Sequence, residues 1–586
     1  MLKRTLRAPA PPLFWAVFAV WALITGVGCA GPTVRVEPSL STSGGAVAAV
    51  DRHAAEVGAT ILAQGGNAID AAVATALALA VTWPPAGNIG GGGLMLVHLA
   101  DGQQFALDFR ETAPAAIRAD MFLDHDGLYD AERALDPALC AGVPGSVAGL
   151  FLAHETWGQL TWPELVAPAI RLASEGFVVD NNLARWLAAH EDDFAAQPFS
   201  AAVFLDLNGQ AHSAGHTLIQ SDLAATLQRI ADQGPQGFYE GPVSEQIVDF
   251  IQQAGGPMTL GDLAAYKPVV RRPMQIPYRG HTVLAFGPPS SGGVAMAQIL
   301  GQLQRVGWGA ETLLSADDVH LYAEAARRAF ADRAAHLGDP AYHDVPVDTL
   351  LSGSRLDVMA RSIERDSASP SEDFGPELCD EPEHDTTHLS VVDRFDNAVS
   401  LTTTLEQAFG GKAIAGRSGV LLNDQLRDFN RIPGQTRAVG HIGTAANLAA
   451  PGKRPLTSMT PIIVVQDGHP VLITGSPGGR TIINTVTRVL LSVIDRGLPL
   501  AEAVALPRVH HSWFPDEILV EPGALSDAVL AELRARGHVV RVAEATGPLL
   551  GTQGCANTIA VDLATGLRTA AGDGRREGWA AAADLP

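Results

Sequence analysis

The sequence has little cysteine: four residues, Cys29, Cys140, Cys379 and Cys555, in a chain of 586. None of these cysteines is spaced as CxxC, which argues against a disulfide scaffold and against a structural zinc site. Basic residues are also scarce, because 40 Lys and Arg stand against 63 Asp and Glu, a formal net charge of −23. No basic stripe interrupts this negative field, which repels a phosphate backbone. The composition therefore excludes a nucleic-acid-binding protein.

Long apolar runs are rare, and the one at residues 13–28 follows a basic stretch and closes on small residues. This order is typical of an export signal, which we place at residues 1–28. A retained membrane anchor is the alternative, but the run is short for a bilayer core of about 30 Å. The following Cys29 resembles the lipid-attachment cysteine of bacterial lipoproteins. Residues 29–45, rich in Ser, Thr and Gly, are then a possible lipoprotein tether.

No collagen-like or heptad period runs through the chain, and 47% of its residues are hydrophobic, which excludes a fibrous or disordered protein. Helical spacing predicts two helices within residues 46–81, separated by a Gly-Gly pair, with Asn67 capping the second. A glycine run then leads into a predicted core strand at 94–99, with 104–110 as its hairpin partner. Residues 142–303 show a mostly helical pattern.

An acidic stretch at 367–385 predicts an exposed link, and the period of the hydrophobic pattern changes after it. Apolar and polar residues then alternate at 388–393 and 398–404, and again at 461–465 and 471–474, as in two strand hairpins. An apolar helical pattern covers 482–496. Strands facing strands with helices outside predict an α+β chain folded as a four-layer αββα sandwich.

Several familiar motifs are missing or incomplete. The Gly90–Gly93 run lacks the Lys-Ser/Thr pair of a phosphate-binding loop and precedes a strand, so it indicates a tight turn. No Gly-x-Ser-x-Gly elbow is present, which argues against a serine α/β-hydrolase. His510 and His511 are neighbours on an extended segment and point to opposite faces. The sequence predicts no metal and no organic cofactor.

The most informative position is the junction between Asp385 and Thr386, where the acidic link ends and a strand begins. If this bond were cut, Thr386 would stand at the tip of a core strand with a free α-amine. Its hydroxyl could then attack a carbonyl while the amine, with a pKa near roughly 8, accepts the proton. An ordinary β-branched strand residue is the alternative interpretation.

Nearly the whole chain after the possible tether resembles the γ-glutamyltranspeptidase family. The resemblance rests on motifs in the family's order, at residues 64–72, 87–93, 108–114, 143–146, 386–388, 453–459 and 475–479. It implies an N-terminal-nucleophile hydrolase fold formed jointly by two subunits of one self-cleaving precursor. Residues 46–385 would form the large subunit and 386–586 the small catalytic subunit, with cleavage just before Thr386.

The resemblance also implies the roles of the catalytic residues. Thr386 would be both the residue that directs cleavage and the mature nucleophile. Thr404 matches the threonine whose hydroxyl holds the nucleophile's side chain. Gly478 and Gly479 match the backbone donors to the oxyanion, where glycine lets N–H groups approach the developing charge closely.

The substrate-binding residues implied by the resemblance follow the charges of a γ-glutamyl group. Its α-carboxylate would be bound by Arg110 together with the hydroxyls of Thr457 and Ser458. Its α-ammonium would be bound by Gln425 and Asp428. Glu406 stands where the best-known members carry an Asn that touches the same ammonium.

From the resemblance we expect an exported γ-glutamyltransferase and glutathione hydrolase, periplasmic or anchored as a lipoprotein, touching a membrane only through lipid at Cys29. Thr386 would form a γ-glutamyl ester with a substrate such as glutathione and pass the group to water, an amino acid or a dipeptide. A cephalosporin or glutaryl acylase of the same fold is the first alternative. An inactive lipoprotein that binds amino acids or peptides is the second.

Overall fold

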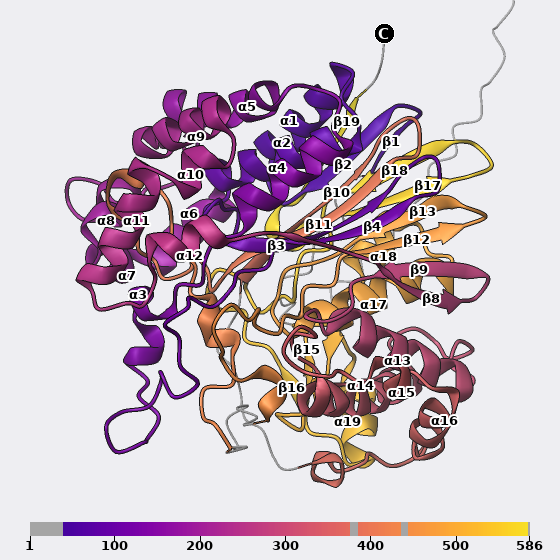
Figure 1. The fold of residues 1–586 in the computed structure, drawn as a ribbon. Coiled ribbons are helices and arrows are strands. Elements are labelled where there is room, and N and C mark those ends of the chain that lie inside the picture. Colours follow the sequence, from indigo (N-terminus) through magenta and orange to yellow (C-terminus); the bar gives the residue numbers. More distant parts are fainter. Residues whose placement is uncertain (1–38, 376–384, 435–443, 584–586) are drawn as a thin grey trace, which may run out of the picture.

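The computed structural model describes residues 39–375, 385–434 and 444–583 (Figure 1). The expected export signal, Cys29 and Cys379 lie outside these ranges. Within them, none of the helices combines the length and the apolar character needed to cross a membrane.

Two seven-stranded antiparallel sheets form the centre of the molecule. We call the first sheet I; its strands, in spatial order, are β19 (Trp579–Ala583), β2 (Gly45–Ala49), β10 (Asp385–Val392), β11 (Ala398–Glu406), β3 (Gly92–His98), β4 (Gln104–Asp108) and β7 (Val269–Arg271). Sheet II consists of β1 (Leu40–Thr42), β18 (Leu567–Ala571), β17 (Thr558–Asp562), β13 (His469–Thr474), β12 (Ile462–Gln466), β9 (His281–Ala285) and β8 (Met274–Tyr278). Two small sheets contain β14 (Val509–His510), β15 (Ile518–Val520) and β16 (Val540–Val542), and β5 (Phe177–Val178) with β6 (Thr217–Leu218).

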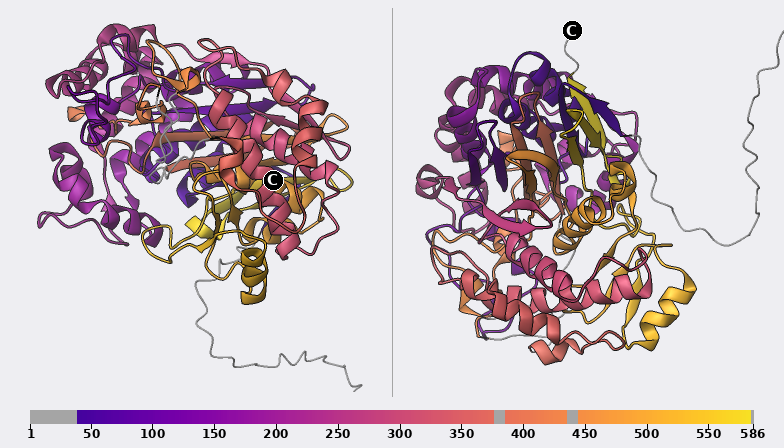
Figure 2. Two further views of the ribbon diagram at one scale, coloured as in Figure 1. Left: turned by 90° about the horizontal axis from the view of Figure 1, so that it is seen from below. Right: turned by 90° about the vertical axis from the view of Figure 1, so that its right-hand side faces the viewer.

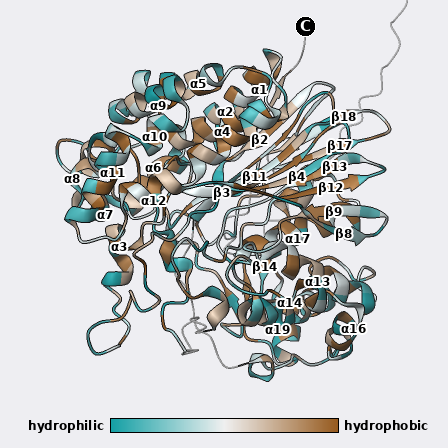
Figure 3. Cartoon of the chain, viewed as in Figure 1, coloured by the Kyte–Doolittle hydropathy of each residue, from teal (hydrophilic) through white to brown (hydrophobic). Residues whose placement is uncertain are grey.

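Alternation along the strands builds the layers, because successive side chains of a strand point to opposite faces. In β3, Met95 and Val97 pack into the core under the helices, whereas Leu94 and Leu96 pack into the core between the two sheets. In β12, Ile463 likewise faces the core between the sheets. Each sheet is therefore buried on both faces, and the colouring by hydropathy shows apolar residues along these strands (Figure 3).

Helices cover the outer face of each sheet, as the views from other sides also show (Figure 2). The helices on the side of sheet I are α1 (Arg52–Ala63), α2 (Ala68–Thr82), α3 (Pro137–Cys140), α4 (Ser146–Trp157), α5 (Trp162–Glu175), α6 (Asn181–Ala189), α7 (Glu191–Ala195), α8 (Pro198–Phe204), α9 (Ser221–Gln233), α10 (Gln236–Tyr239), α11 (Pro242–Gln253) and α12 (Leu260–Ala265). Those on the side of sheet II are α13 (Gly292–Arg305), α14 (Ala316–His336), α15 (Val347–Leu350), α16 (Gly353–Arg361), α17 (Thr481–Ile494), α18 (Leu500–Ala505) and α19 (Asp527–Ala535). The predicted αββα sandwich is confirmed.

The predicted helix cap is confirmed as well. Asn67 caps α2: its side chain accepts hydrogen bonds from the backbone N–H groups of Ile69 and Asp70, and the Asp70 side chain accepts one from the Asn67 N–H. The hairpin of β10 and β11 turns through Asp396, whose φ is +71°, a left-handed conformation that Asp tolerates better than most residues.

Some strands were not predicted. Gly45–Ala49 is β2, whereas the first helix was expected to begin at residue 46, so this expectation was wrong. Residues 142–303 are mostly helical, as predicted, but they also contain the short strands β5, β6, β7, β8 and β9. The turn between β8 and β9 is Arg279-Gly280, with positive φ at both residues, so the Asn-Gly signal of such a hairpin is missing from the sequence. Within the expected tether, Leu40–Thr42 is strand β1 and pairs with β18.

The buried charges on α14 give a pH prediction. The Glu324 carboxylate accepts hydrogen bonds from Arg328 Nη1 at 2.7 Å and Ser369 Oγ at 2.6 Å, and pairs with Arg327. Burial alone would raise the pKa of Glu324, but Arg327 and Arg328 outweigh it and hold the pKa at about 2. A lowered pKa stabilises the folded state above the unfolded value of 4.5 and loses this effect as the pH falls towards 2.

Glu324→Gln should therefore lower the free energy of unfolding by about 3 kcal/mol at pH 7, and the difference from the parent should shrink as the pH falls below 4.5. Urea unfolding between pH 3 and pH 7 measures both effects. Glu532→Gln is the matched control, because the exposed ion pair of Glu532 with Arg536 contributes about 0–1 kcal/mol. A loss that is constant over this pH range would contradict the prediction.

Candidate active site

Strand pairing places Thr386 opposite Thr404 at the end of β10 and β11. The Thr386 hydroxyl donates to Thr404 Oγ1 at 3.5 Å, and the Thr404 hydroxyl donates to the carbonyl oxygen of Asp385 at 2.7 Å. The backbone N–H of Glu406 donates to the same Thr404 oxygen at 2.9 Å. Thr404 thus contacts both the hydroxyl of Thr386 and the carbonyl of the peptide bond that precedes it.

The residue before Thr386 is not part of an exposed link, contrary to the sequence-based expectation. Asp385 is only 2% exposed, and its Oδ1 accepts a hydrogen bond from Arg576 Nη1 at 2.5 Å. The same Arg576 nitrogen lies 3.5 Å from the Thr386 carbonyl oxygen, and its guanidinium lies over the ring of Trp186. Burial raises the pKa of Asp385, and the Arg576 cation opposes this rise. A buried ion pair therefore surrounds the bond between Asp385 and Thr386.

A glycine turn lies beside Thr386, just before α17. Gly478 and Gly479 have φ values of +122° and +54°, a region that favours glycine. A Cβ atom on Gly478 would lie 2.4 Å from Thr481 Oγ1, which donates to the Gly478 carbonyl at 2.7 Å. Because the first N–H groups of a helix lack partners within the helix, this turn is suited to stabilise negative charge.

Opposite charges meet in the cavity that Thr386 lines. Arg110 follows β4, is fully buried, and donates to Asp428 Oδ2 from Nη2 and to Glu111 Oε2 from Nη1 at 3.3 Å. Gln425 donates to the same Asp428 oxygen at 2.6 Å. A zwitterionic ligand could bind these two residues, with its carboxylate on Arg110 and its ammonium on Asp428.

Glu111 adds a titratable group behind Arg110. Burial raises its pKa to about 7, and the Arg110 cation opposes this rise. Its Oε1 has no hydrogen-bond partner among the described residues. Glu111 therefore titrates near neutral pH in contact with the arginine that the sequence assigned to a substrate carboxylate.

The remaining predicted residues lie at the same cavity. Ser458 Oγ accepts a hydrogen bond from Arg333 of α14 at 3.0 Å, and Thr457 Oγ1 accepts one from the Met459 N–H at 3.1 Å. Glu406 is buried, has a φ of +87°, and lies 3.8 Å from Arg427. The cavity is lined by Arg110, Thr386, Thr404, Glu406, Gln425, Asp428, Thr457, Ser458 and Gly479, so every predicted site residue except Gly478 reaches it.

Sequence reasoning missed Arg576, Arg333, Glu111 and the burial of Asp385. Arg576 is far from Thr386 along the chain, and Arg333 lies in a helix that packs on the other sheet. Of these, only Glu111 fell inside a motif that the sequence singled out. No spacing signal could have found the other contacts, since sheet pairing and layer packing create them.

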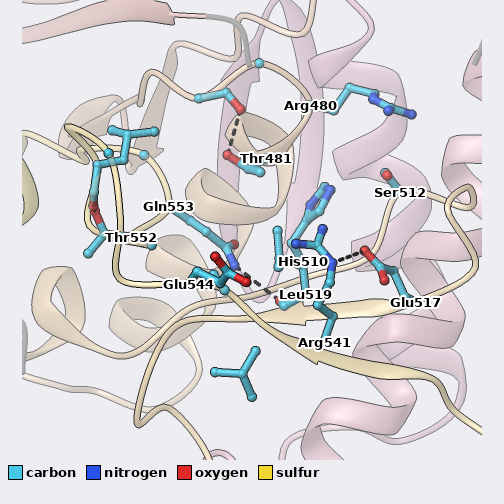
Figure 4. Close-up of a pocket in the computed structure, with 18 of the residues that line it drawn as sticks. Arg480, Thr481, His510, Ser512, Glu517, Leu519, Arg541, Glu544, Thr552 and Gln553 are labelled. Carbon is cyan, nitrogen blue, oxygen red and sulfur yellow. Dashed lines mark hydrogen bonds and ion pairs between the residues drawn. The ribbon is translucent and has the colours of Figure 1, made fainter. Parts of the chain in front are cut away.

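A second, larger cavity of about 520 Å³ adjoins the first at the glycine turn (Figure 4). Gly479 and Arg480 line both cavities, and Gly478 lines the larger one. His510, Glu517, Arg541 and other polar residues surround it.

The structure offers two groups of described side chains that a metal could bring together, His320 with Glu324 and His538, and Asp124 with His125 and Asp126. The first group fits a metal poorly, because two arginines already pair with Glu324. Neither group lines the cavity at Thr386.

Comparison with known proteins places this arrangement in a family. The model of the γ-glutamyltranspeptidase family matches residues 54–583. The chain belongs to the γ-glutamyltranspeptidase family. It is 44% identical to the glutathione hydrolase proenzyme of Escherichia coli (strain K12) over 504 residues, which cover 86% of this chain and 87% of that protein. It is also 44% identical to the glutathione hydrolase proenzyme of Pseudomonas aeruginosa over 501 residues, 85% of this chain and 88% of that protein.

Solved structures agree with the γ-glutamyltranspeptidase assignment. The cephalosporin acylase from Bacillus halodurans superposes with a TM-score of 0.82 at 26% identity, over 96% of this chain and all of that chain. A chain of the Helicobacter pylori γ-glutamyltranspeptidase matches with a TM-score of 0.55 at 39% identity, over 56% of this chain and 93% of that chain. The αββα sandwich is thus the N-terminal-nucleophile hydrolase fold of γ-glutamyltranspeptidases and related acylases.

The buried pair at the junction yields a stability prediction. Arg576→Ala should lower the free energy of unfolding of the uncut chain by about 3–5 kcal/mol, because it leaves the Asp385 carboxylate buried without its cation. Combining it with Asp385→Asn should recover part of this loss. Thermal unfolding measures the difference, with Arg118→Ala, which breaks an exposed pair with Asp120, as the control. Equal midpoints for Arg576→Ala and the control would show that the pair does not stabilise the junction.

Proposed function

We propose that the chain is a self-processing γ-glutamyltransferase and glutathione hydrolase whose nucleophile is Thr386. The observation that carries this proposal is the cavity that Thr386 lines together with the Arg110–Asp428 pair and Gly479, in a γ-glutamyltranspeptidase chain. The proenzyme names of relatives at 44% identity support the same activity.

Self-cleavage comes first in the proposed sequence. The Thr386 hydroxyl oxygen attacks the Asp385 carbonyl carbon, the bond to the Thr386 nitrogen breaks, and that nitrogen takes up the proton. Water then hydrolyses the resulting ester and releases the large subunit, 46–385, from the small subunit, 386–586. The Thr404 hydroxyl, 2.7 Å from the Asp385 carbonyl oxygen, is positioned to stabilise negative charge on that oxygen.

Turnover then uses the freed amine of Thr386. This amine accepts the hydroxyl proton as the oxygen attacks the γ-amide carbonyl of the substrate. Backbone N–H groups at Gly478 and Gly479 would stabilise the oxyanion, and the departing amine takes up the proton. The γ-glutamyl ester on Thr386 then reacts with water or with the amine of an amino acid or dipeptide.

Substrate recognition follows from the two charges beside Thr386. The α-carboxylate of a γ-glutamyl group would bind Arg110 and the hydroxyls of Thr457 and Ser458, and the α-ammonium would bind Asp428, Gln425 and Glu406. Arg110 and Asp428 form an ion pair with each other in the structure. A zwitterion that separates Arg110 from Asp428 gives each of them a new partner of opposite charge. A group with a single charge would leave one of the two residues buried without a partner.

A glutaryl or cephalosporin acylase is the second candidate. It is favoured by the likeness to the Bacillus halodurans cephalosporin acylase and by 37% identity to the acylase ACY 1 proenzyme of Pseudomonas sp. (strain V22) over 494 residues. A glutaryl group lacks the ammonium, so it would leave Asp428 and Glu406 without a cation from the substrate. We therefore prefer the γ-glutamyl substrate.

Export completes the proposal. The basic and apolar segment at residues 1–28 would direct the chain out of the cytoplasm, and Cys29 is the candidate for lipid attachment. The place of action would then be the periplasm or the outer face of a membrane.

The identity of the nucleophile is tested by Thr386→Ala. This variant should stay a single chain and lose γ-glutamyl turnover, because it lacks the oxygen for both steps. A denaturing gel and sequencing of the small subunit's N-terminus measure the cut in the parent, which should begin at Thr386. Thr387→Ala is the control and should still be cut. A processed and active Thr386→Ala variant would exclude Thr386.

The substrate class is tested with p-nitroanilides. The parent should hydrolyse the γ-glutamyl anilide with a higher kcat/KM than the glutaryl anilide. Asp428→Asn should reduce this preference by about tenfold or more, as expected for loss of a charged hydrogen bond. Faster turnover of the glutaryl anilide by the parent would favour the acylase instead.

A further inference from the structure

The two hydroxyl groups that flank the glycine turn have no part in the roles assigned so far. Ser476 precedes the turn and is fully buried, and Thr481 follows it as the first residue of α17. The proposed oxyanion needs the N–H groups of Gly478 and Gly479. Neither of these N–H groups donates to an acceptor within residues 39–375, 385–434 and 444–583. The turn therefore holds two unused donors, and their value to a reaction depends on the direction in which they point.

The turn begins against the strand that carries Thr386. Gly475, at the start of the turn, leaves room for the ring of His388, because a Cβ atom on Gly475 would lie 2.4 Å from His388 Nδ1. His388 is two residues beyond Thr386 on β10, so the two side chains are on the same face of sheet I. This close approach fixes the start of the turn relative to the strand of Thr386.

Peptide geometry alone leaves the direction of the two donors open. A trans peptide is planar, with its N–H and its C=O on opposite sides. The N–H of Gly478 therefore points away from the Pro477 carbonyl, and the N–H of Gly479 points away from the Gly478 carbonyl. A turn with Pro second and Gly third can be type I or type II, which differ by a flip of the peptide between them. Glycine permits both orientations.

Hydrogen bonds from the two hydroxyls remove this freedom. Ser476 Oγ accepts from the Cys555 N–H at 2.9 Å and donates to the Pro477 carbonyl at 2.8 Å. Thr481 Oγ1 donates to the Gly478 carbonyl at 2.7 Å, a bond drawn as a dashed line in Figure 4. The backbone N–H of Thr481 donates to the same oxygen at 3.0 Å. A flip of either peptide would break these bonds and leave a hydroxyl without its acceptor.

Gly554 holds the Ser476 hydroxyl in place from the other side. Its φ is +67°, and a Cβ atom there would lie 2.4 Å from Ser476 Oγ and 3.0 Å from the Pro477 carbonyl oxygen. Since the backbone packs this closely against both atoms, the hydroxyl has little room to turn away from the carbonyl. The orientation of the first peptide of the turn is thus set by contacts with a segment that is distant in sequence.

We propose that Ser476 and Thr481 are positioning residues for the oxyanion. By holding two carbonyls of the turn, their hydroxyls direct the N–H groups of Gly478 and Gly479 toward the carbonyl that Thr386 attacks. The inference rests on the proposed function, because it explains how the donors named there are oriented. Donors fixed in advance stabilise the charge of the transition state without reorganisation. The two hydroxyls therefore act on kcat, through the peptides that they hold, and leave substrate affinity unchanged.

The test separates turnover from self-cleavage. Ser476→Ala should lower the kcat for γ-glutamyl-p-nitroanilide by about five- to tenfold, as expected for one lost hydrogen bond, with KM within about twofold of the parent. Formation and hydrolysis of the ester both pass through an oxyanion, so kcat falls whichever step is slower. Self-cleavage should be unchanged, since its negative charge lies on the Asp385 carbonyl beside Thr404. Steady-state kinetics and a denaturing gel measure the two effects.

Thr481 offers a matched pair of variants. Thr481→Val keeps the shape and removes the donor, and it should lower kcat by about two- to fivefold, because the backbone N–H still holds the carbonyl. Thr481→Ser keeps the hydroxyl and should retain the parent kcat. The control for burial is Ser418→Ala, which should also retain it. Like Ser476, the buried Ser418 hydroxyl donates to a carbonyl, at 2.6 Å, and accepts an N–H, at 3.1 Å, but it lines neither cavity.

The outcomes distinguish this inference from the proposed function. A parent kcat in folded and fully cut Ser476→Ala and Thr481→Val would overturn the inference alone. An equal loss of kcat in Ser418→Ala would also overturn it, because the hydroxyls would then act only through stability. If Ser476→Ala fails to fold, the two Thr481 variants carry the same comparison. A parent that does not cleave the anilide would overturn the proposed function, and the inference with it.

Discussion

The register between β10 and β11 is the constraint on which the candidate site depends. It sets Thr386 opposite Thr404, so that one hydroxyl contacts both the Thr386 oxygen and the carbonyl of Asp385. A slip of one residue would turn Thr386 to the other face of sheet I, because side chains alternate along a strand. Both strands lie in the interior of a seven-stranded sheet with apolar cores on both faces, which fixes this register.

Buried charge is the second recurring feature of the site. Arg576 pairs with Asp385 at the junction, and Arg110 contacts both Asp428 and Glu111 beside it. Such pairs add little net stability, because taking two charges out of water offsets most of their attraction. Under the proposed function the Arg110–Asp428 pair selects a substrate that carries both charges, and the Arg576–Asp385 pair holds the chain around the bond before Thr386.

The glycine turn before α17 divides the region into two cavities with different chemistry. Arg110 and Asp428 line one cavity, His510 lines the other, and Arg480 lines both. A carbonyl at Thr386 would lie between them, with the turn's N–H groups nearby.

The sequence by itself determined the sandwich and most of the site. Period-two alternation predicted the central hairpins, and the motifs named Arg110, Thr386, Asp428 and the glycine pair, which line the cavities as expected. The sequence did not predict β8 and β9, because their hairpin turn is Arg-Gly and lacks the usual Asn-Gly signal. It also predicted that Asp385 is exposed, because the neighbouring residues are acidic, whereas Asp385 is buried.

Only the tertiary structure decided which distant residues join these motifs. Arg576 reaches Asp385 because Trp579–Ala583, just beyond it, pairs with β2, which in turn pairs with β10. Arg333 reaches Ser458, and Asn484 orients His510, because helices that cover sheet II pack against the loops at its end. Local pattern carries no information on such contacts, since they arise from the order of strands in a sheet and from the packing of its layers.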